Sequence, residues 1–391
     1  MKETFRWYGE GLDKISLADI RQTGASGIVT SLHEIPYGEV WSRDAIGKRR
    51  DLIKAAGMDW TVVESLPLHE DIKRGTGDLT MLFANYRQSM AHLAAEGIDT
   101  ICYNFMPLLD WTRTDLHAPV ANGGTCLRFE AHRMAAFEIH MLGRMEAAED
   151  YPSDVLTKAA EWYTASTQED RDTLLASIMA GLPGAFDRYD VNGLRQALQS
   201  YSGLSHSDLR ANYKRFLDEI IPTAEELGMR FCVHPDDPPR DILGLPRIVS
   251  NADDIDWIMS AHDSNANGLT LCSGSLGANP DNDVVAIAEQ NASRIHFAHL
   301  RNVRKDPDGS FEESAHLEGD TNMVALARVL LNEENRRKAN DRPDFDIPFR
   351  PDHGHDLLSD ASMGTYPGYP LIGRMRGLAE LRGVIHALEA I

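Results

Sequence analysis

Cysteine is scarce in this sequence, and no two cysteines are closely spaced. The 391 residues include only four, Cys102, Cys126, Cys232 and Cys272, and no CxxC pair occurs. This argues against a disulfide-rich secreted scaffold and against a closed structural zinc site built from short-spaced pairs. The N-terminus also lacks the apolar core of a signal peptide. We therefore expect a cytoplasmic protein with reduced thiols.

Long apolar runs and clustered positive charge are absent too. No apolar stretch reaches the roughly 18 residues that a membrane-spanning helix needs. Lys and Arg number 39 against 60 Asp and Glu, so the formal net charge is 39 − 60 = −21. Nucleic-acid binders and proteins that dock on anionic membranes need basic clusters, so we expect neither partner. Hydrophobic content of 42% with 25% charged residues is typical of a globular chain.

Eight short runs rich in β-forming residues recur along the chain, and most segments between them show helical spacing of apolar residues. The runs lie at 4–8, 27–32, 60–64, 100–105, 230–234, 269–272, 295–299 and 347–350. Alternating strands and helices favour parallel strands with right-handed crossovers. No GxGxxG motif follows a run, which argues against a doubly wound sheet. We predict an α/β fold, a (β/α)8 TIM barrel, as a single domain over residues 1–391.

One connection is much longer than the others. About 125 residues separate the fourth and fifth predicted strands, whereas a single crossover unit needs about thirty. Residues 128–200 are mostly helical by pattern, with apolar side chains along one face of the segment from Phe129 to Met145. We predict a helical insertion at 128–200 that lies over the active-site end of the barrel, as a lid or a dimerisation element.

Metal-binding residue types stand at the ends of four consecutive predicted strands. His234 ends the fifth strand, Cys272 the sixth and His299 the seventh, and Asp352 follows the eighth. The carboxyl ends of barrel strands meet at the active-site rim. Thiolate, imidazole and carboxylate together suit Zn²⁺, Fe²⁺ or Mn²⁺, and ligands spread over about 120 residues favour a catalytic site.

Strand alternation separates the two histidines of the seventh strand. Successive side chains face opposite ways, so His296 and His299 cannot both point into the barrel. His299 is nearer the carboxyl end, and we choose it as the ligand; His296 then faces the helices. By the same argument Cys232 lies deeper in the barrel than His234 and is core.

Other polar residues at or just beyond strand ends are candidates for binding a small substrate. They are Tyr8, His33, Glu64, Asn104 and Arg350, with Arg113 on the loop after the fourth strand. The forked guanidinium of Arg350 or Arg113 suits a substrate carboxylate. A loop after the eighth strand could bring Tyr366 or Tyr369 over the metal.

These groups together could catalyse a reaction at the carbon next to a carboxylate. A divalent metal that holds a hydroxy acid makes its α-proton more acidic. A histidine or tyrosine can remove that proton while another acid protonates a leaving β-hydroxyl, which is a dehydration. An aldose–ketose isomerase or an epimerase would use similar groups, and so would the pocket of a non-catalytic sugar-acid sensor, although binding alone needs no acid–base pair.

Several segments together resemble the D-mannonate dehydratase family of hexuronate catabolism, over nearly the whole chain. The segments are 4–9, 27–30, 38–41, 102–107, 110–116, 234–239 and 350–355. The resemblance implies a xylose-isomerase-like barrel that converts D-mannonate to 2-dehydro-3-deoxy-D-gluconate and water with Mn²⁺ or Fe²⁺, in a homodimer. Carried over by motif, the metal ligands are His234, Cys272, His299 and Asp352, and the catalytic pair is His353 and Tyr369.

Overall fold

Eight parallel strands close into a barrel, and this confirms the predicted fold. The computed structural model describes residues 1–181 and 189–390. Around the barrel the strands follow the order β1-β12-β9-β8-β7-β4-β3-β2. Their bounds are β1 Lys2–Arg6, β2 Gly27–Thr30, β3 Asp59–Glu64, β4 Thr100–Tyr103, β7 Arg230–Val233, β8 Asn267–Cys272, β9 Ile295–His299 and β12 Pro348–Arg350.

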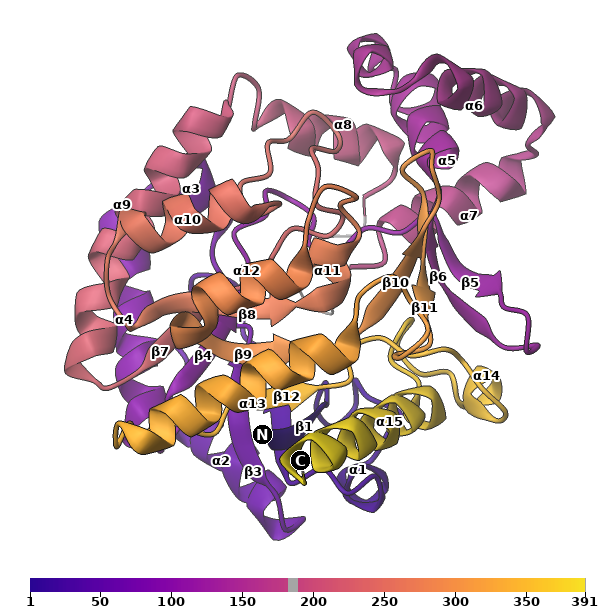
Figure 1. Cartoon of the computed structure of the whole chain (residues 1–391). Helices are drawn as coiled ribbons and strands as arrows, with labels where there is room; N and C mark the ends of the chain where they lie inside the picture. The colour runs from indigo at the N-terminus through magenta and orange to yellow at the C-terminus, as the bar shows by residue number, and fades with distance from the viewer. Residues whose placement is uncertain (182–188, 391) are drawn as a thin grey trace.

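Helices surround the barrel (Figure 1). They are α1 Leu17–Gln22, α2 Arg43–Ala55, α3 Glu70–Arg74, α4 Leu79–Ala95, α9 His206–Glu226, α10 Ala252–Ala261, α11 Ser273–Gly277, α12 Val284–Asn291, α13 Met323–Ala339, α14 Asp360–Met363 and α15 Leu371–Glu389, with a 3₁₀ turn at Ala292–Arg294. Side-chain caps define where several begin. The Ser42 and Asp78 side chains accept hydrogen bonds from the first turns of α2 and α4, and Ser205 forms a capping box with Asp208.

The strands are buried on both faces, as expected of a parallel barrel. A large apolar core lies between the strands and the surrounding helices. A second, small cluster consists of Val29, Val62, Cys102, Cys232 and Phe297, which come from five barrel strands and fill the interior. Cys232 is therefore core, as predicted. Phe297 lies in this cluster, so His299, two residues further on, faces the same side of the strand.

A four-stranded antiparallel sheet stands beside the barrel. Its order is β10-β11-β6-β5, with bounds β10 Asn302–Lys305, β11 Phe311–Ser314, β6 Thr125–Phe129 and β5 Asp115–Pro119. It joins the chain that leaves β9 to the chain that leaves β4. The sequence pattern did not predict the β5–β6 hairpin, which occupies the start of the long connection.

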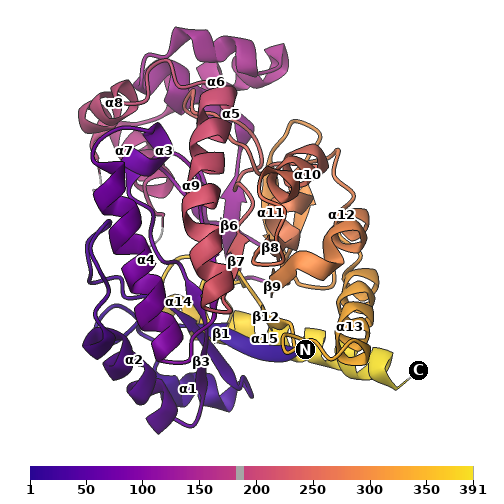
Figure 2. The same ribbon diagram turned by 90° about the vertical axis from the view of Figure 1, so that its left-hand side faces the viewer.

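Helical segments follow the hairpin and share an apolar core with the small sheet. They are α5 Ala131–Ala136, a π-helical turn Phe137–Met141, a 3₁₀ segment Met145–Asp150, α6 Ser153–Ala165, α7 Gln168–Ile178 and α8 Val191–Gln199. Figure 1 shows α5, α6 and α7 gathered beside the sheet, and Figure 2 shows α6 and α8 at the end of the molecule away from the two termini. Residues 182–188 of the predicted insertion lie outside the described residues.

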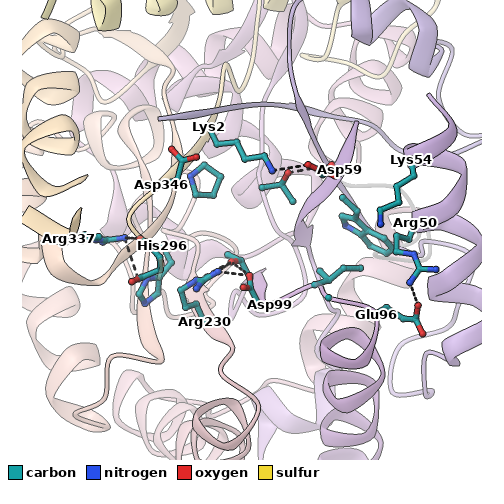
Figure 3. Close-up of a pocket in the computed structure, with 17 residues that line it drawn as sticks. Lys2, Arg50, Lys54, Asp59, Glu96, Asp99, Arg230, His296, Arg337 and Asp346 are labelled. Atoms are coloured by element: carbon teal, nitrogen blue, oxygen red, sulfur yellow. Dashed lines mark hydrogen bonds and ion pairs between the residues drawn. The ribbon is translucent and has the colours of Figure 1, made fainter. Parts of the chain in front are cut away.

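A polar depression opens at the amino end of the barrel (Figure 3). Its charged side chains largely pair with one another, as Lys2 does with Asp59 and Arg230 with Asp99. His296 lines this depression, away from the rim that carries His299. No helix within residues 1–181 and 189–390 combines the length and the apolar character needed to cross a membrane.

Candidate metal centre

The four predicted metal ligands lie at the carboxyl end of the barrel. Cys272 and His299 are the last residues of β8 and β9 and pair directly across the two strands. His234 directly follows β7, and Asp352 comes two residues after the end of β12. The closed barrel therefore brings to one rim four side chains that are far apart in the sequence.

The donor atoms of these four residues converge. Those of His234, Cys272 and His299 all lie within 4.8 Å of one another. Asp352 Oδ2 lies 3.8 Å from His299 Nδ1 and 3.9 Å from Cys272 Sγ. An ion with bonds of about 2.0–2.3 Å in tetrahedral geometry holds its ligands about 3.3–3.8 Å apart, so the spacing suits a shared ion.

The two imidazoles lie close together at the rim. His234 Nδ1 lies 2.6 Å from the carbonyl oxygen of Pro235, to which it donates, so Nε2 carries the lone pair. His299 Nδ1 lies 3.1 Å from this nitrogen and donates to it. His299 Nε2 is buried without a hydrogen-bond partner among the described residues, 3.4 Å from Glu64 Oε2. A cation between the two facing nitrogens would move the proton of His299 to Nε2, where Glu64 can accept it, so the donor set fits a divalent metal.

The thiol of Cys272 is held by the short helix that follows it. Its sulfur accepts hydrogen bonds from the backbone N–H of Ser275 at 3.4 Å and from the Ser275 hydroxyl at 3.1 Å. These contacts fix the position of the sulfur at the rim, beside the other donor atoms.

A second group of donor atoms, from Glu64, Cys102 and His299, also lies within 4.8 Å. Burial raises the pKa of the Cys102 thiol well above its usual value. This deeper group is therefore less suited to an ion than the group at the rim.

Eight buried charged side chains line the rim in a continuous series of ion pairs, which we call the buried charge network. Cations and anions alternate along it in the order Arg6, Glu64, Arg350, Asp352, Arg301, Asp237, Arg113 and Glu313. Four positive and four negative charges cancel. A divalent ion and the Cys272 thiolate would add +2 and −1, and the resulting charge of +1 matches a substrate with one carboxylate.

The network keeps its carboxyl groups ionised. Burial alone raises the pKa of Asp352, but the Arg350 guanidinium outweighs burial and the pKa lies well below its usual value. Burial also raises the pKa of Glu64, but Arg350 outweighs burial, and this pKa too lies well below its usual value. For Glu313, burial is outweighed first by Arg301, and the pKa falls to about 2. All three groups are therefore anions at neutral pH.

The two arginines predicted to bind substrate are held by protein carboxylates. Arg350 donates from Nε and Nη2 to Glu64 at 3.0 and 2.8 Å and also pairs with Asp352. Arg113 donates to Asp237 at 2.7 and 3.1 Å and to Glu313 at 2.8 Å. Arg350 lines the cavity beside the metal-ligand group, whereas Arg113 is not among its lining residues.

The remaining substrate-binding candidates lie around the same end of the barrel. Glu64 and Asn104 line the cavity at the metal-ligand group, and Asn104 also lines an adjoining cavity together with His33. The Tyr8 hydroxyl is buried without a hydrogen-bond partner among the described residues. The Tyr8 ring packs against His33, with 5.7 Å between the ring centroids, and against Tyr369, at 5.1 Å.

His353 and Tyr369 lie together beside Asp352. Their ring centroids are 5.0 Å apart with the planes nearly perpendicular. His353 Nδ1 lies 3.0 Å from Glu313 Oε1 and 3.0 Å from Arg301 Nη1. Burial and then the Asp352 carboxylate raise the pKa of Tyr369 to about 12, so its hydroxyl keeps its proton at neutral pH.

Two adjoining cavities open at the site. The inner one is lined by Glu64, Asn104, Met106, Asp110, Trp111, His234, Asp237, Arg301, Arg350, Asp352, His353 and Tyr369. The outer one shares Asn104, Met106 and Asp110 with it.

Sequence reasoning did not select Arg6, Arg301, Asp237, Glu313 or Trp111. Arg301 comes two residues after His299, so strand alternation could have placed both side chains on the same side. Asp237 comes three residues after His234 and could have been selected by its proximity to that ligand. Glu313 comes from β11 of the small sheet, which no strand-end argument reaches.

Comparisons with known proteins agree over the full length of the chain. A family profile described as D-mannonate dehydratase (UxuA) matches residues 1–391. A mannonate dehydratase of Chromohalobacter salexigens is 50% identical over 392 residues and one of Marinomonas sp. is 49% identical over 391 residues, each with full coverage of both chains. The crystal structure of a mannonate dehydratase from Streptococcus suis has a TM-score of 0.78 and 34% identity, and the match covers 100% of this chain and 94% of that one.

Proposed function

The chain belongs to the D-mannonate dehydratase family, and we propose that it is a hydro-lyase that converts D-mannonate to 2-dehydro-3-deoxy-D-gluconate and water. The observation that carries the proposal is the convergence of the donor atoms of His234, Cys272, His299 and Asp352, together with a cavity lined by two of these residues, His234 and Asp352, and by His353 and Tyr369. A metal-ligand group next to an acid–base pair is what dehydration next to a carboxylate requires.

The proposed ligands of a divalent metal are His234, Cys272, His299 and Asp352. The carbonyl of Pro235 holds the outer nitrogen of His234, and Ser275 holds the sulfur of Cys272, so two of the ligands are oriented before an ion binds. A bound divalent ion supplies Lewis acidity at the substrate carboxylate and 2-hydroxyl, which makes the C2 proton more acidic. We propose Mn²⁺ or Fe²⁺ as the ion.

The protein then moves two protons. His353 and Tyr369 share the work: one removes the proton from C2, and the other gives a proton to the 3-hydroxyl as the C3–O bond breaks and water leaves. The resulting enol takes a proton at C3 and gives up the proton of its 2-hydroxyl, and so becomes the 2-keto-3-deoxy acid. The two rings are in edge-to-face contact and line the same cavity, which supports their acting on one substrate.

Arg350 contributes to binding from the cavity wall. Its guanidinium is held by Glu64 and Asp352, so it acts mainly as a fixed positive charge and offsets part of the −21 net charge near the substrate. Arg113 contributes to substrate binding indirectly, because it holds Asp237 and Glu313 in place. Asn104, His33, Glu64 and Tyr8 complete the proposed substrate-binding set.

The proposal extends to the state of the protein in the cell. All four cysteines are free and buried, and a thiolate ligand at position 272 requires a reducing compartment, which favours the cytoplasm. We propose a homodimer, which light scattering on the purified protein tests.

The activity test uses D-mannonate, its C2 epimer and its C3 epimer with metal-free and Mn²⁺-loaded protein. A 2-keto-3-deoxy acid formed from D-mannonate, and detected by the periodate–thiobarbiturate reaction, supports the dehydration. A keto sugar, or C2 proton exchange without loss of water, would instead identify an isomerase or epimerase.

A further inference from the structure

The small antiparallel sheet delivers one side chain into the catalytic pair. Glu313 lies in β11, which pairs with β10 on one side and with β6 on the other. Its side chain is 1% exposed, and its Oε1 lies 3.0 Å from His353 Nδ1. The neighbouring Glu312 pairs with Arg128 at 2.7 Å instead, as strand alternation requires.

The ring of His353 is held on several sides. Trp111 and Tyr369 meet it at steep angles, with ring centroids 5.8 and 5.0 Å away. Nδ1 has partners, whereas no partner of Nε2 occurs among the described residues, and His353 lines the cavity. Nε2 is therefore the ring nitrogen available to a substrate.

Glu313 and Arg301 both contact Nδ1 of His353, and the two contacts require different tautomers of the ring. Glu313 accepts, so its contact needs a proton on Nδ1. Arg301 only donates, so its contact at 3.0 Å needs a lone pair there. With a lone pair on Nδ1, the Glu313 carboxylate would face it at 3.0 Å without a proton between them. Arg301 has other acceptors in Asp352 and Asp237, at 3.2 and 2.7 Å. The contact with Glu313 therefore decides the tautomer, and the proton lies on Nδ1.

We propose that Glu313 is a positioning residue that holds His353 as the Nδ1–H tautomer and so makes Nε2 the acceptor of the substrate C2 proton. Tyr369 is then the proton donor to the departing 3-hydroxyl. This inference rests on the proposed dehydration for its kinetic part, but its structural part, the tautomer of His353, stands without it. It gives the accessory sheet a role in catalysis, because β11 carries Glu313 across from the barrel wall.

The kinetic test is a double-mutant cycle with Glu313→Gln and His353→Asn. The amide keeps the size of Glu313 but removes its charge, and we expect kcat to fall by about 10- to 100-fold, with KM and metal content nearly unchanged. If Glu313 acts only through His353, Glu313→Gln in the His353→Asn background costs nothing further. Losses that multiply in the double variant would overturn the inference, because they would show an independent structural effect.

Glu312→Gln is the matched control. It changes the same residue type on the same strand and breaks an ion pair with Arg128, but it has no contact with His353. We expect wild-type kcat. A loss like that of Glu313→Gln would mean that any charge lost from β11 lowers activity, and it would contradict a specific role of Glu313.

The second arm does not depend on turnover. Ring-¹⁵N-labelled histidine in the Zn²⁺-loaded protein, with the His353 signals assigned by their loss in His353→Asn, reports which nitrogen carries the proton. We expect the proton on Nδ1. A proton on Nε2 would refute the inference whether or not D-mannonate is dehydrated, whereas wild-type protein without product but with Nδ1–H would refute only the proposed function.

Discussion

Replacing Arg350 by methionine removes one cation from the middle of the buried charge network while keeping most of the side-chain volume. Arg350 is 1% exposed and bridges Glu64 and Asp352. After the change, three cations face four anions, and 3 − 4 leaves −1 among buried side chains. Removing one partner of a buried pair typically costs about 3–5 kcal/mol, because the other charge stays buried and uncompensated.

That cost converts into a measurable shift of the melting temperature. With about 2.1 cal/mol/K of unfolding entropy per residue, a chain of 391 residues has about 0.8 kcal/mol/K, so 3–5 kcal/mol lowers Tm by about 4–6 °C. The uncompensated negative charge lies beside the proposed metal ligands. Mn²⁺ should therefore raise the Tm of the variant by more than it raises that of wild type.

The assay is calorimetry of metal-free and Mn²⁺-loaded protein, with Arg382→Met as control. Arg382 also pairs with a carboxylate, that of Glu3, but its side chain is 29% exposed, and such pairs are worth about 1 kcal/mol or less. Equal melting temperatures for the two metal-free variants would refute the claim that removing one cation leaves an uncompensated charge in the buried charge network. An Mn²⁺ shift smaller than that of wild type would show that Arg350 matters mainly by orienting Asp352.

Three further outcomes follow from the geometry. Cys272→Ser should lose Fe²⁺ or Zn²⁺ on dialysis more readily than wild type, because thiolate is a stronger ligand for these ions than a hydroxyl; unchanged metal content would make Cys272 part of the core only. His353→Asn should keep its metal and lose at least about 100-fold in turnover, and parallel loss of metal and turnover would make His353 a ligand. Burial raises the pKa of Asp344, but hydrogen bonds from Arg342 outweigh it and bring the pKa to about 2. A lowered pKa stabilises the fold above the unfolded value near 4, so Asp344→Asn should cost about 1–2 kcal/mol at pH 7 and progressively less as the pH falls toward 2 in urea titrations; a cost independent of pH would contradict this.

Strand ends and alternation account for the part of the site that the sequence could reveal. His234, Cys272, His299 and Asp352 follow directly from asking what each predicted strand ends on, because a closed barrel must bring those ends together.

Pairing between distant segments accounts for the rest. The sequence gives no sign that Arg113 meets Asp237 and Glu313, so both predicted substrate arginines looked free when in fact each is held by carboxylates. Glu313 reaches His353 only because β11 pairs with β6, far away in the chain. Its contribution depends on a tertiary arrangement that no local pattern specifies.

The net charge of −21 illustrates the same difference between composition and site. It argues against polyanionic partners that contact a broad surface. Around the rim, however, the buried charge network is neutral, and a divalent ion would make the site positive. Because these charges are buried and close together, high salt should weaken substrate capture only slightly.

The most direct test of the account is turnover of D-mannonate by protein stripped of metal and then reloaded with Mn²⁺, with bound metal measured in the same samples. We predict a 2-keto-3-deoxy acid only from the loaded protein, in proportion to its metal content. Protein that demonstrably holds the metal but makes no product above the metal-free control would contradict the account.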